Sequence, residues 1–196
     1  MGTRSATTYE EILEAAEVVF STNGYRGTSL DAIAQQLGIT RQALYHYFPR
    51  KVDVLIALNR RMIQLFHDKV DEAVAEIATS GENAFTVLVR THARTVAENV
   101  SLVSVFIREA TNVPEPEKAE LNALRRAYQD RFVAIYRSGV QYGQLRDVDP
   151  GVAVNILLGA ANHLCYWYSA EGDIPPEKIA DVVVDVLRSG FGTVPS

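Results

Sequence analysis

Apolar residues recur at helical spacing along almost the whole chain. Between positions 12 and 20 they are Ile12, Leu13, Ala16, Val19 and Phe20, and the same spacing of three or four residues returns in each later segment. No alternating run of apolar and polar residues is long enough to indicate a β-strand. The pattern therefore predicts an all-α fold of about nine helices.

Capping residues, glycines and prolines divide this pattern into separate helices. Gly38 ends the second helix, in a turn that favours a positive φ, and Thr40 is the expected N-cap of a short third helix that Pro49 ends. Further helices are predicted over residues 52–79, 82–99, 101–112, 116–142 and 150–170, with a last one after Pro175-Pro176.

The composition excludes several classes of protein. The net charge of −5 over 196 residues argues against a basic coat over the whole chain, although it leaves room for a local basic patch. Cys165 is the single cysteine, so no internal disulfide forms. Residues 151–170 carry no charged side chain, but Asn155, Asn162 and His163 interrupt them. We therefore expect a helix buried in protein there, and no membrane association.

The second and third helices have the spacing of a helix-turn-helix. Only residues 38–40 separate them, and so short a turn suits a large crossing angle. The segment 40–51 holds Arg41, Arg50 and Lys51 and no acidic residue. Arginine and glutamine recognise base edges in the major groove, while threonine, tyrosine and lysine suit phosphates. Together these features favour DNA binding over an ordinary polar helix face.

Two runs of residues carry a resemblance to a known family. They are GYRGTSLDAIA at residues 24–34 and LGITRQALYHYFPRK at residues 37–51, and they strongly resemble the N-terminal domain of the TetR family of transcriptional repressors. The resemblance is detailed from residue 8 to about residue 60. It implies a helix-turn-helix DNA-binding domain at residues 8–52, extending into helix 52–79, and a helical ligand-binding and dimerisation domain at residues 53–196.

The resemblance also implies a function and a set of contacts. The implied protein is a cytoplasmic homodimer that binds a palindromic operator in double-stranded DNA and is released by a small ligand. By position, the phosphate contacts are Thr28, Tyr45 and Lys51, the base-reading residues are Thr40, Arg41, Gln42 and Ala43, and His46 makes a mixed contact. Gln42 departs from the small residue common in the family. Its amide either contacts adenine or rests on the backbone.

The last two predicted helices carry apolar stripes that suit a dimer interface. We expect Leu157, Ala161 and Leu164, with Val183 and Leu187 of the last helix, to build a four-helix bundle with a second copy. The family uses its last two helices in this way. The alternative is that both stripes face the core of the single chain.

The remaining aromatic residues suggest an apolar ligand pocket. Its expected lining is Phe66, Phe85, Leu88, His92, Phe106, Arg108, Tyr128, Phe132, Gly159, His163, Tyr166 and Trp167. The expected ligand is small and hydrophobic or amphipathic, with an acyl thioester as one candidate. For each aromatic residue the alternative is plain core packing, and for His92 and His163 it is a satisfied buried polar group.

Other function classes fit the sequence less well. It contains no nucleophile elbow, phosphate-binding loop or dinucleotide motif, and no two histidines stand four residues apart. We therefore expect no catalysis, no metal and no cofactor. The alternatives are a constitutive DNA-binding regulator without a ligand switch, a structural helical dimer, or a helical small-molecule-binding protein or enzyme without DNA binding. The basic segment 40–51 separates these, because only the DNA-binding readings need it.

Overall fold

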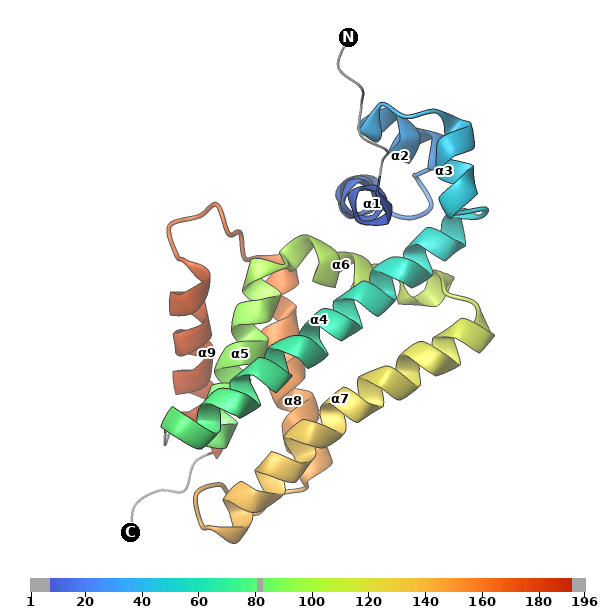
Figure 1. Ribbon diagram of the computed structural model, residues 1–196. Coiled ribbons are helices and arrows are strands. Elements are labelled where there is room, and N and C mark those ends of the chain that lie inside the picture. Colours follow the sequence, from blue (N-terminus) through green and yellow to red (C-terminus); the bar gives the residue numbers. More distant parts are fainter. Residues whose placement is uncertain (1–7, 81–82, 192–196) are drawn as a thin grey trace. The chain divides into compact units, whose positions relative to one another are not determined.

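The computed structural model describes residues 8–80 and 83–191, and within them every regular element is a helix (Figure 1). The prediction of an all-α fold is confirmed. The α-helices in these residues are α1 (Tyr9–Asn23), α2 (Leu30–Leu37), α3 (Arg41–Tyr47), α4 (Lys51–Ser80), α5 (Ala84–Glu98), α6 (Val100–Glu109), α7 (Glu115–Gln141), α8 (Pro150–Asn162) and α9 (Pro176–Phe191). Two short 3₁₀ helices, η1 (Ala110–Asn112) and η2 (His163–Tyr166), follow α6 and α8.

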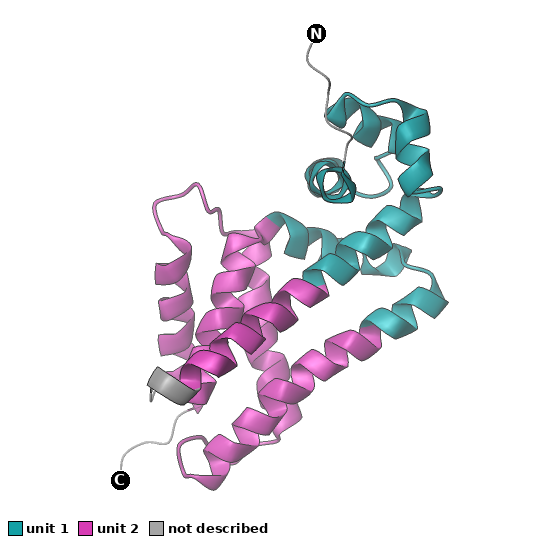
Figure 2. Cartoon of the chain, in the orientation of Figure 1, with its two compact units in different colours: residues 1–62, 101–121 teal, residues 63–100, 122–196 magenta. Residues whose placement is uncertain are grey.

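The chain divides into two compact units (Figure 2). The first comprises residues 1–62 and 101–121, and the second comprises residues 63–100 and 122–196. Helices α4 and α7 each contribute residues to both units. None of the helices within residues 8–80 and 83–191 is long and apolar enough to cross a membrane.

In the first unit, α1, α2 and α3 pack around a small core. Phe20 of α1, Ile33 of α2 and Leu44 of α3 are almost completely buried there. Helix α2 ends at Gly38, whose φ of 62° lies in the left-handed region that glycine adopts without strain. Thr40 caps α3, because its side chain accepts a hydrogen bond from the Ala43 N–H at 3.2 Å. The predicted turn and cap are confirmed, and they fix how α3 leaves α2.

In the second unit, α5 packs against both α8 and α9. Ala93 of α5, Ala161 of α8 and Ala180 of α9 meet at this junction with no exposed surface, and Val183 packs against them. The short alanine side chains let the three helices approach closely, because the distance between helix axes depends on the residues at the contact.

The helix predicted over residues 150–170 is shorter than expected. Helix α8 ends at Asn162, and the 3₁₀ turn η2 follows it to Tyr166. No glycine or proline marks this end in the sequence, so the apolar pattern continues past it. Such a 3₁₀ turn is a frequent way to end an α-helix.

Candidate DNA-binding surface and ligand region

Helix α3 buries one residue, half-buries Tyr45 and exposes the others. Leu44 is completely buried beneath it, whereas Arg41, Gln42, Ala43 and His46 are exposed. All four are residues for which the sequence predicted DNA contacts, so the structure brings them together on one accessible helix. Thr40 is also exposed, and because its oxygen serves as the cap acceptor, its hydroxyl hydrogen remains available to a phosphate.

Arg41 is held in place by two neighbours. Its Nε lies 3.2 Å from Oδ1 of Asp31 on α2, and its Nη2 donates to the hydroxyl of Tyr45 at 3.0 Å. The guanidinium carbon also lies 4.9 Å from the centre of the Tyr45 ring. These contacts order a long side chain that would otherwise sample many conformations in water.

Two of the residues that the resemblance assigns to phosphate contacts, Thr28 and Lys51, make hydrogen bonds within the protein. Thr28 is buried, with 5% of its surface exposed, and its hydroxyl donates to the Gly24 carbonyl at 2.8 Å. Because a hydroxyl has one hydrogen and a phosphate oxygen only accepts, this hydrogen bond occupies the donor that a phosphate would need. Lys51 donates to the carbonyls of Tyr25 and Thr28 at 2.6 and 2.7 Å, which leaves one of its three hydrogens for DNA.

The loop between α1 and α2 is tied down through Tyr25. Its N–H donates to Glu109 of α6 at 3.1 Å, and its carbonyl accepts from Lys51 of α4. The Lys51 ammonium lies 4.2 Å from the centre of the Tyr25 ring, which adds a cation–π contact. Lys51 therefore stabilises the DNA-binding unit itself, a role that the sequence motif alone does not reveal.

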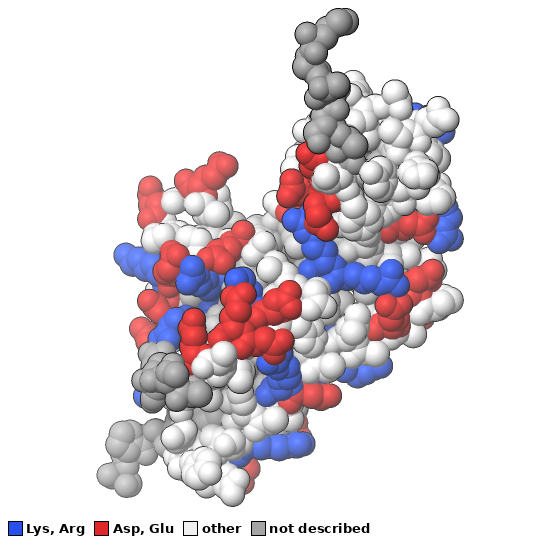
Figure 3. Space-filling view, viewed as in Figure 1, with Lys and Arg blue, Asp and Glu red and all other residues white. Residues whose placement is uncertain are grey.

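The basic segment 40–51 is less positive than the sequence suggests. Asp31 pairs with Arg41, and Asp53 accepts hydrogen bonds from Arg50 at 3.1 Å. Both aspartates lie outside the segment in sequence and are brought to it by the fold. The Arg50 side chain lowers the pKa of Asp53, so this carboxylate stays ionised. Acidic and basic side chains are also interspersed over the face seen in Figure 3.

Six of the predicted pocket residues are buried in the second unit. Phe66, His92, Tyr128 and Phe132 form one aromatic cluster, in which Phe66 lies 5.1 Å from His92 and Tyr128 lies 5.1 Å from Phe132 between ring centres. Phe85 packs against Tyr136 at 5.7 Å, and Leu88 is completely buried. The cluster is a packed apolar region with one polar pair inside it.

That polar pair is His92 and Tyr128. Nδ1 of His92 lies 2.9 Å from the Tyr128 hydroxyl oxygen. Burial lowers the pKa of His92 to about 4, although the Asn162 side chain and the Leu158 carbonyl on α8 partly oppose the shift. Nε2 of His92 does not reach hydrogen-bonding geometry with any described residue. The imidazole is therefore neutral at physiological pH.

The other predicted pocket residues lie elsewhere. Phe106 and Arg108 are on α6 and belong to the first unit, with Phe106 half-buried and Arg108 exposed. Gly159 and His163 are exposed, and a side chain at Gly159 would meet open space. Tyr166 and Trp167 are 52% and 58% exposed. These last four residues are exposed in the single chain and do not join the aromatic cluster there, so their place in a ligand pocket stays a prediction.

The single chain buries the predicted dimer face of α8. Leu157, Ala161 and Leu164 are at most 2% exposed, because they pack inside the second unit. Val183 and Leu187 of α9 are half-buried. The large apolar residues left exposed on α8, η2 and α9, with Trp167 directly after η2, are Val152, Ile156, Tyr166, Trp167, Val182 and Val186. In the single chain the predicted α8 stripe packs in the core, as the alternative states, and the opposite side of α8 is exposed.

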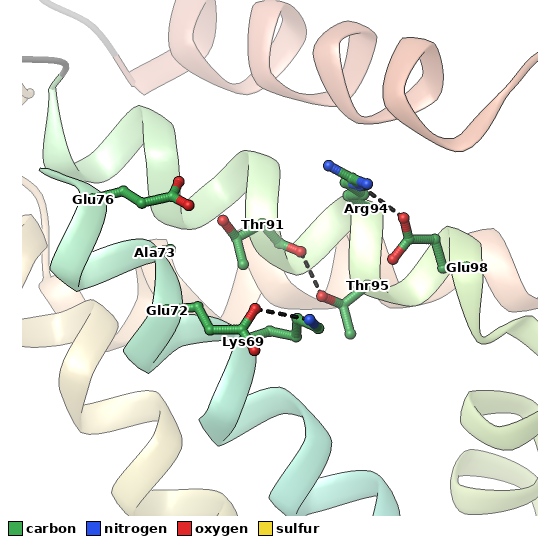
Figure 4. A pocket seen from close by; sticks show the side chains of 8 residues that line it. All are labelled: Lys69, Glu72, Ala73, Glu76, Thr91, Arg94, Thr95 and Glu98. Atoms are coloured by element: carbon green, nitrogen blue, oxygen red, sulfur yellow. Dashed lines mark hydrogen bonds and ion pairs between the residues drawn. The ribbon is translucent and has the colours of Figure 1, made fainter. Parts of the chain in front are cut away.

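A separate pocket of about 250 Å³ opens between α4 and α5 (Figure 4). It shares no residue with the predicted apolar pocket, and its lining is Lys69, Glu72, Ala73, Glu76, Thr91, Arg94, Thr95 and Glu98. Lys69 is paired with Glu72 at 2.7 Å, and Arg94 with Glu98 at 2.7 Å. Because both cations are already neutralised by neighbours, the pocket does not favour an anionic ligand.

The helix-turn-helix and the helical second unit match known families. Residues 12–58 match the family model described as bacterial regulatory proteins of the tetR family. Residues 78–191, more than half of the chain, match the model described as the tetracyclin repressor-like C-terminal domain.

Similar proteins cover nearly the whole chain. The fatty acid metabolism regulator protein of Bacillus subtilis is 24% identical, over 93% of this chain and 95% of its own length. The HTH-type transcriptional repressor KstR2 of Rhodococcus jostii is 24% identical, over 93% of this chain and 90% of its own length. The solved structure of AibR with isovaleryl coenzyme A and operator DNA is 25% identical, with a TM-score of 0.79, over 91% of this chain and 96% of that one. The chain belongs to the TetR family of transcriptional regulators.

Proposed function

We propose that this protein is a ligand-responsive transcriptional repressor that binds a palindromic operator as a homodimer. The observation that carries the proposal is helix α3, the second helix of the helix-turn-helix, which follows the turn at Gly38 and presents Arg41, Gln42 and His46 to solvent. These side chains can reach base edges, while Thr40, Tyr45 and the remaining hydrogen of Lys51 contact phosphates. Such a protein acts in the cytoplasm, where the bacterial chromosome lies, and is not an enzyme.

The dimer contact that we propose uses the exposed apolar side of α8 and α9. Ile156 and Val186 are 54% and 66% exposed, and Trp167 at the end of η2 is 58% exposed. A group of large exposed apolar residues is a common mark of a protein interface. Two copies joined about a two-fold axis present two α3 helices, which explains why the operator should be a palindrome.

The effector that we propose is small and hydrophobic or amphipathic, with an acyl thioester as the leading candidate. The buried aromatic cluster of Phe66, His92, Tyr128 and Phe132 supplies apolar contacts with few polar groups. The related AibR structure holds isovaleryl coenzyme A together with operator DNA. Helix α4 begins at Lys51 and carries Phe66, so a tilt of this helix links the effector to the DNA-binding unit.

The test has two stages. Selection from random double-stranded DNA should recover a palindrome with half-sites about one helical turn apart. Isovaleryl coenzyme A is then titrated against the protein with and without that DNA. Reciprocity requires that the operator weaken effector binding by the factor by which the effector weakens operator binding.

Each stage has an outcome that contradicts the proposal. Failure to recover any palindrome would contradict operator binding. Equal affinity of the effector with and without DNA would identify a constitutive regulator without a switch for this ligand.

A further inference from the structure

Asp31 places a carboxylate on the surface that should face DNA. It lies in the first turn of α2, and its Oδ1 is 3.2 Å from Nε of Arg41, the first residue of α3. The two side chains are 55% and 66% exposed, so water competes with the pair. An exposed ion pair of this kind contributes little to stability, which makes a purely structural role a weak explanation.

The ion pair with Asp31 and the hydrogen bond to Tyr45 determine which edge of the Arg41 guanidinium remains open. A guanidinium has five N–H donors. Nε lies 3.2 Å from Oδ1 of Asp31 in an ion pair, and Nη2 donates one hydrogen to the hydroxyl of Tyr45 at 3.0 Å. The two hydrogens of Nη1 and the second hydrogen of Nη2 are left at the outer end of the group. This end is the part that matches the O6 and N7 acceptors of guanine in the major groove.

Tyr45 restricts the remaining freedom of the guanidinium. The carbon at its centre lies 4.9 Å from the centre of the Tyr45 ring, so the ring supports it while Asp31 fixes one edge. A side chain ordered before binding loses less conformational entropy when it meets its partner. Arg41 is therefore prepared for one base contact before DNA arrives.

We propose that Asp31 is a positioning residue that holds Arg41 for a bidentate contact with guanine and sharpens the base preference of the protein. The carboxylate is repelled by the phosphates of any DNA, so it weakens binding to all sequences. The Arg41–guanine contact compensates this cost only where guanine is present. The inference rests on the proposed operator binding and deepens it by naming the residue behind one base preference.

The experiment compares base preference in a set of variants. Affinities of the full-length protein are measured for the selected operator and for operators changed at each position symmetrically in both half-sites. The variants are Asp31→Asn, Asp31→Ala, Arg41→Ala and the double variant Asp31→Ala/Arg41→Ala. The control is Glu14→Gln, which also removes one exposed carboxylate from the first unit but lies on α1 beside Arg61. Thermal unfolding confirms that each variant is folded.

The expected result is a loss of discrimination confined to one position. Asp31→Ala should reduce the preference for guanine there about two- to fivefold per half-site, the range that an exposed ion pair supports, and Asp31→Asn should reduce it less. Binding to operators that lack this guanine should become tighter. In the Arg41→Ala background, Asp31→Ala should leave base preference unchanged, and Glu14→Gln should leave it unchanged throughout.

Two results would overturn the inference. One is an unchanged guanine preference in Asp31→Ala. The other is an equal change in the presence and absence of Arg41. A wild-type protein that selects no sequence at all would instead overturn the proposed function, and this inference with it.

Discussion

Helices α3 and α8 present opposite kinds of surface to solvent. Helix α3 buries Leu44 and exposes Arg41 and Gln42, whereas α8 buries Leu157 and exposes Ile156. A polar outward face can exchange water for phosphates and base edges, while an apolar outward face gains most from meeting another protein. The proposed function therefore places DNA contacts on α3 and self-association on the exposed side of α8.

Leu157 and Ile156 are neighbours on α8 that lie in opposite environments. Leu157→Asp places a charge in the core of the second unit, where the residue is 1% exposed, and should destabilise the fold by about 3–5 kcal/mol or prevent folding. Ile156→Asp changes a residue that is 54% exposed and should leave the single chain folded. It should instead disrupt the dimer.

Light scattering and thermal unfolding together distinguish the two variants. The wild type should have twice the chain mass of 21.7 kDa, and Ile156→Asp should have the single-chain mass with an unchanged fold by circular dichroism. Val18→Asp is the control, because Val18 is 53% exposed on α1. A dimeric Ile156→Asp, or a well-folded monomeric Leu157→Asp, would restore the face of α8 that the sequence suggested.

The difference between α3 and α8 also explains why the sequence predicts the buried side of one helix and not of the other. On α3 polar and apolar residues alternate with the helix turn, so the buried side is evident from the residues themselves. On α8 both sides are apolar, and hydrophobicity does not tell the side facing α5 and α9 from the side facing solvent. The small residues Ala161 and Gly159 fit either environment, yet Ala161 is buried and Gly159 exposed.

Side-chain contacts between separate helices are a second feature that the sequence does not predict. The turn at Gly38 and the cap at Thr40 depend on local residues and were predicted correctly. The pairing of Arg41 with Asp31 depends on how α2 and α3 cross, which no spacing rule specifies. The contact between Tyr25 and Glu109 joins residues 84 positions apart and has no sequence signal at all.

The buried side of α8 can be examined through pH, because it lies near His92. Burial lowers the pKa of His92 to about 4, below its usual 6.5, so the unfolded chain binds this proton first as the pH falls. The free energy of unfolding should therefore decrease as the pH falls from about 6.5 to about 4, by about 3 kcal/mol from this group.

The matching variant replaces both members of the polar pair. His92→Phe with Tyr128→Phe removes the titrating group and its partner together, which leaves no polar group newly unpaired between them. Urea unfolding at several pH values should show a flatter pH dependence for this double variant than for the wild type. His163→Phe is the control, because His163 is exposed. Equal slopes in the wild type and the double variant would show that His92 is not buried as a neutral group.

Gln42 lies on the exposed polar face of α3, where its amide either contacts adenine or rests on the backbone. If its amide contacts adenine, Gln42→Ala should cost about 1–3 kcal/mol per half-site and relax the preference at one base pair. Gln64→Ala is the control, since Gln64 lies on α4 and is bonded to Asp68. Repeating the DNA selection with both variants decides the matter. An unchanged selected sequence for Gln42→Ala would mean that its amide rests on the protein.

On the polar surface, Lys51 is expected to contact a phosphate and not a base edge. Lys51 donates to the Tyr25 and Thr28 carbonyls and has one hydrogen left for a phosphate. Lys51→Ala should therefore weaken binding to all sequences about equally and reduce the salt dependence of log K by about one unit per half-site. Affinities for the operator and for a scrambled duplex are measured across a range of salt concentrations.

Because the same variant loses two hydrogen bonds to the loop, its thermal unfolding is recorded as well. A lower melting temperature with an unchanged salt slope would assign Lys51 to the structure of the DNA-binding unit alone.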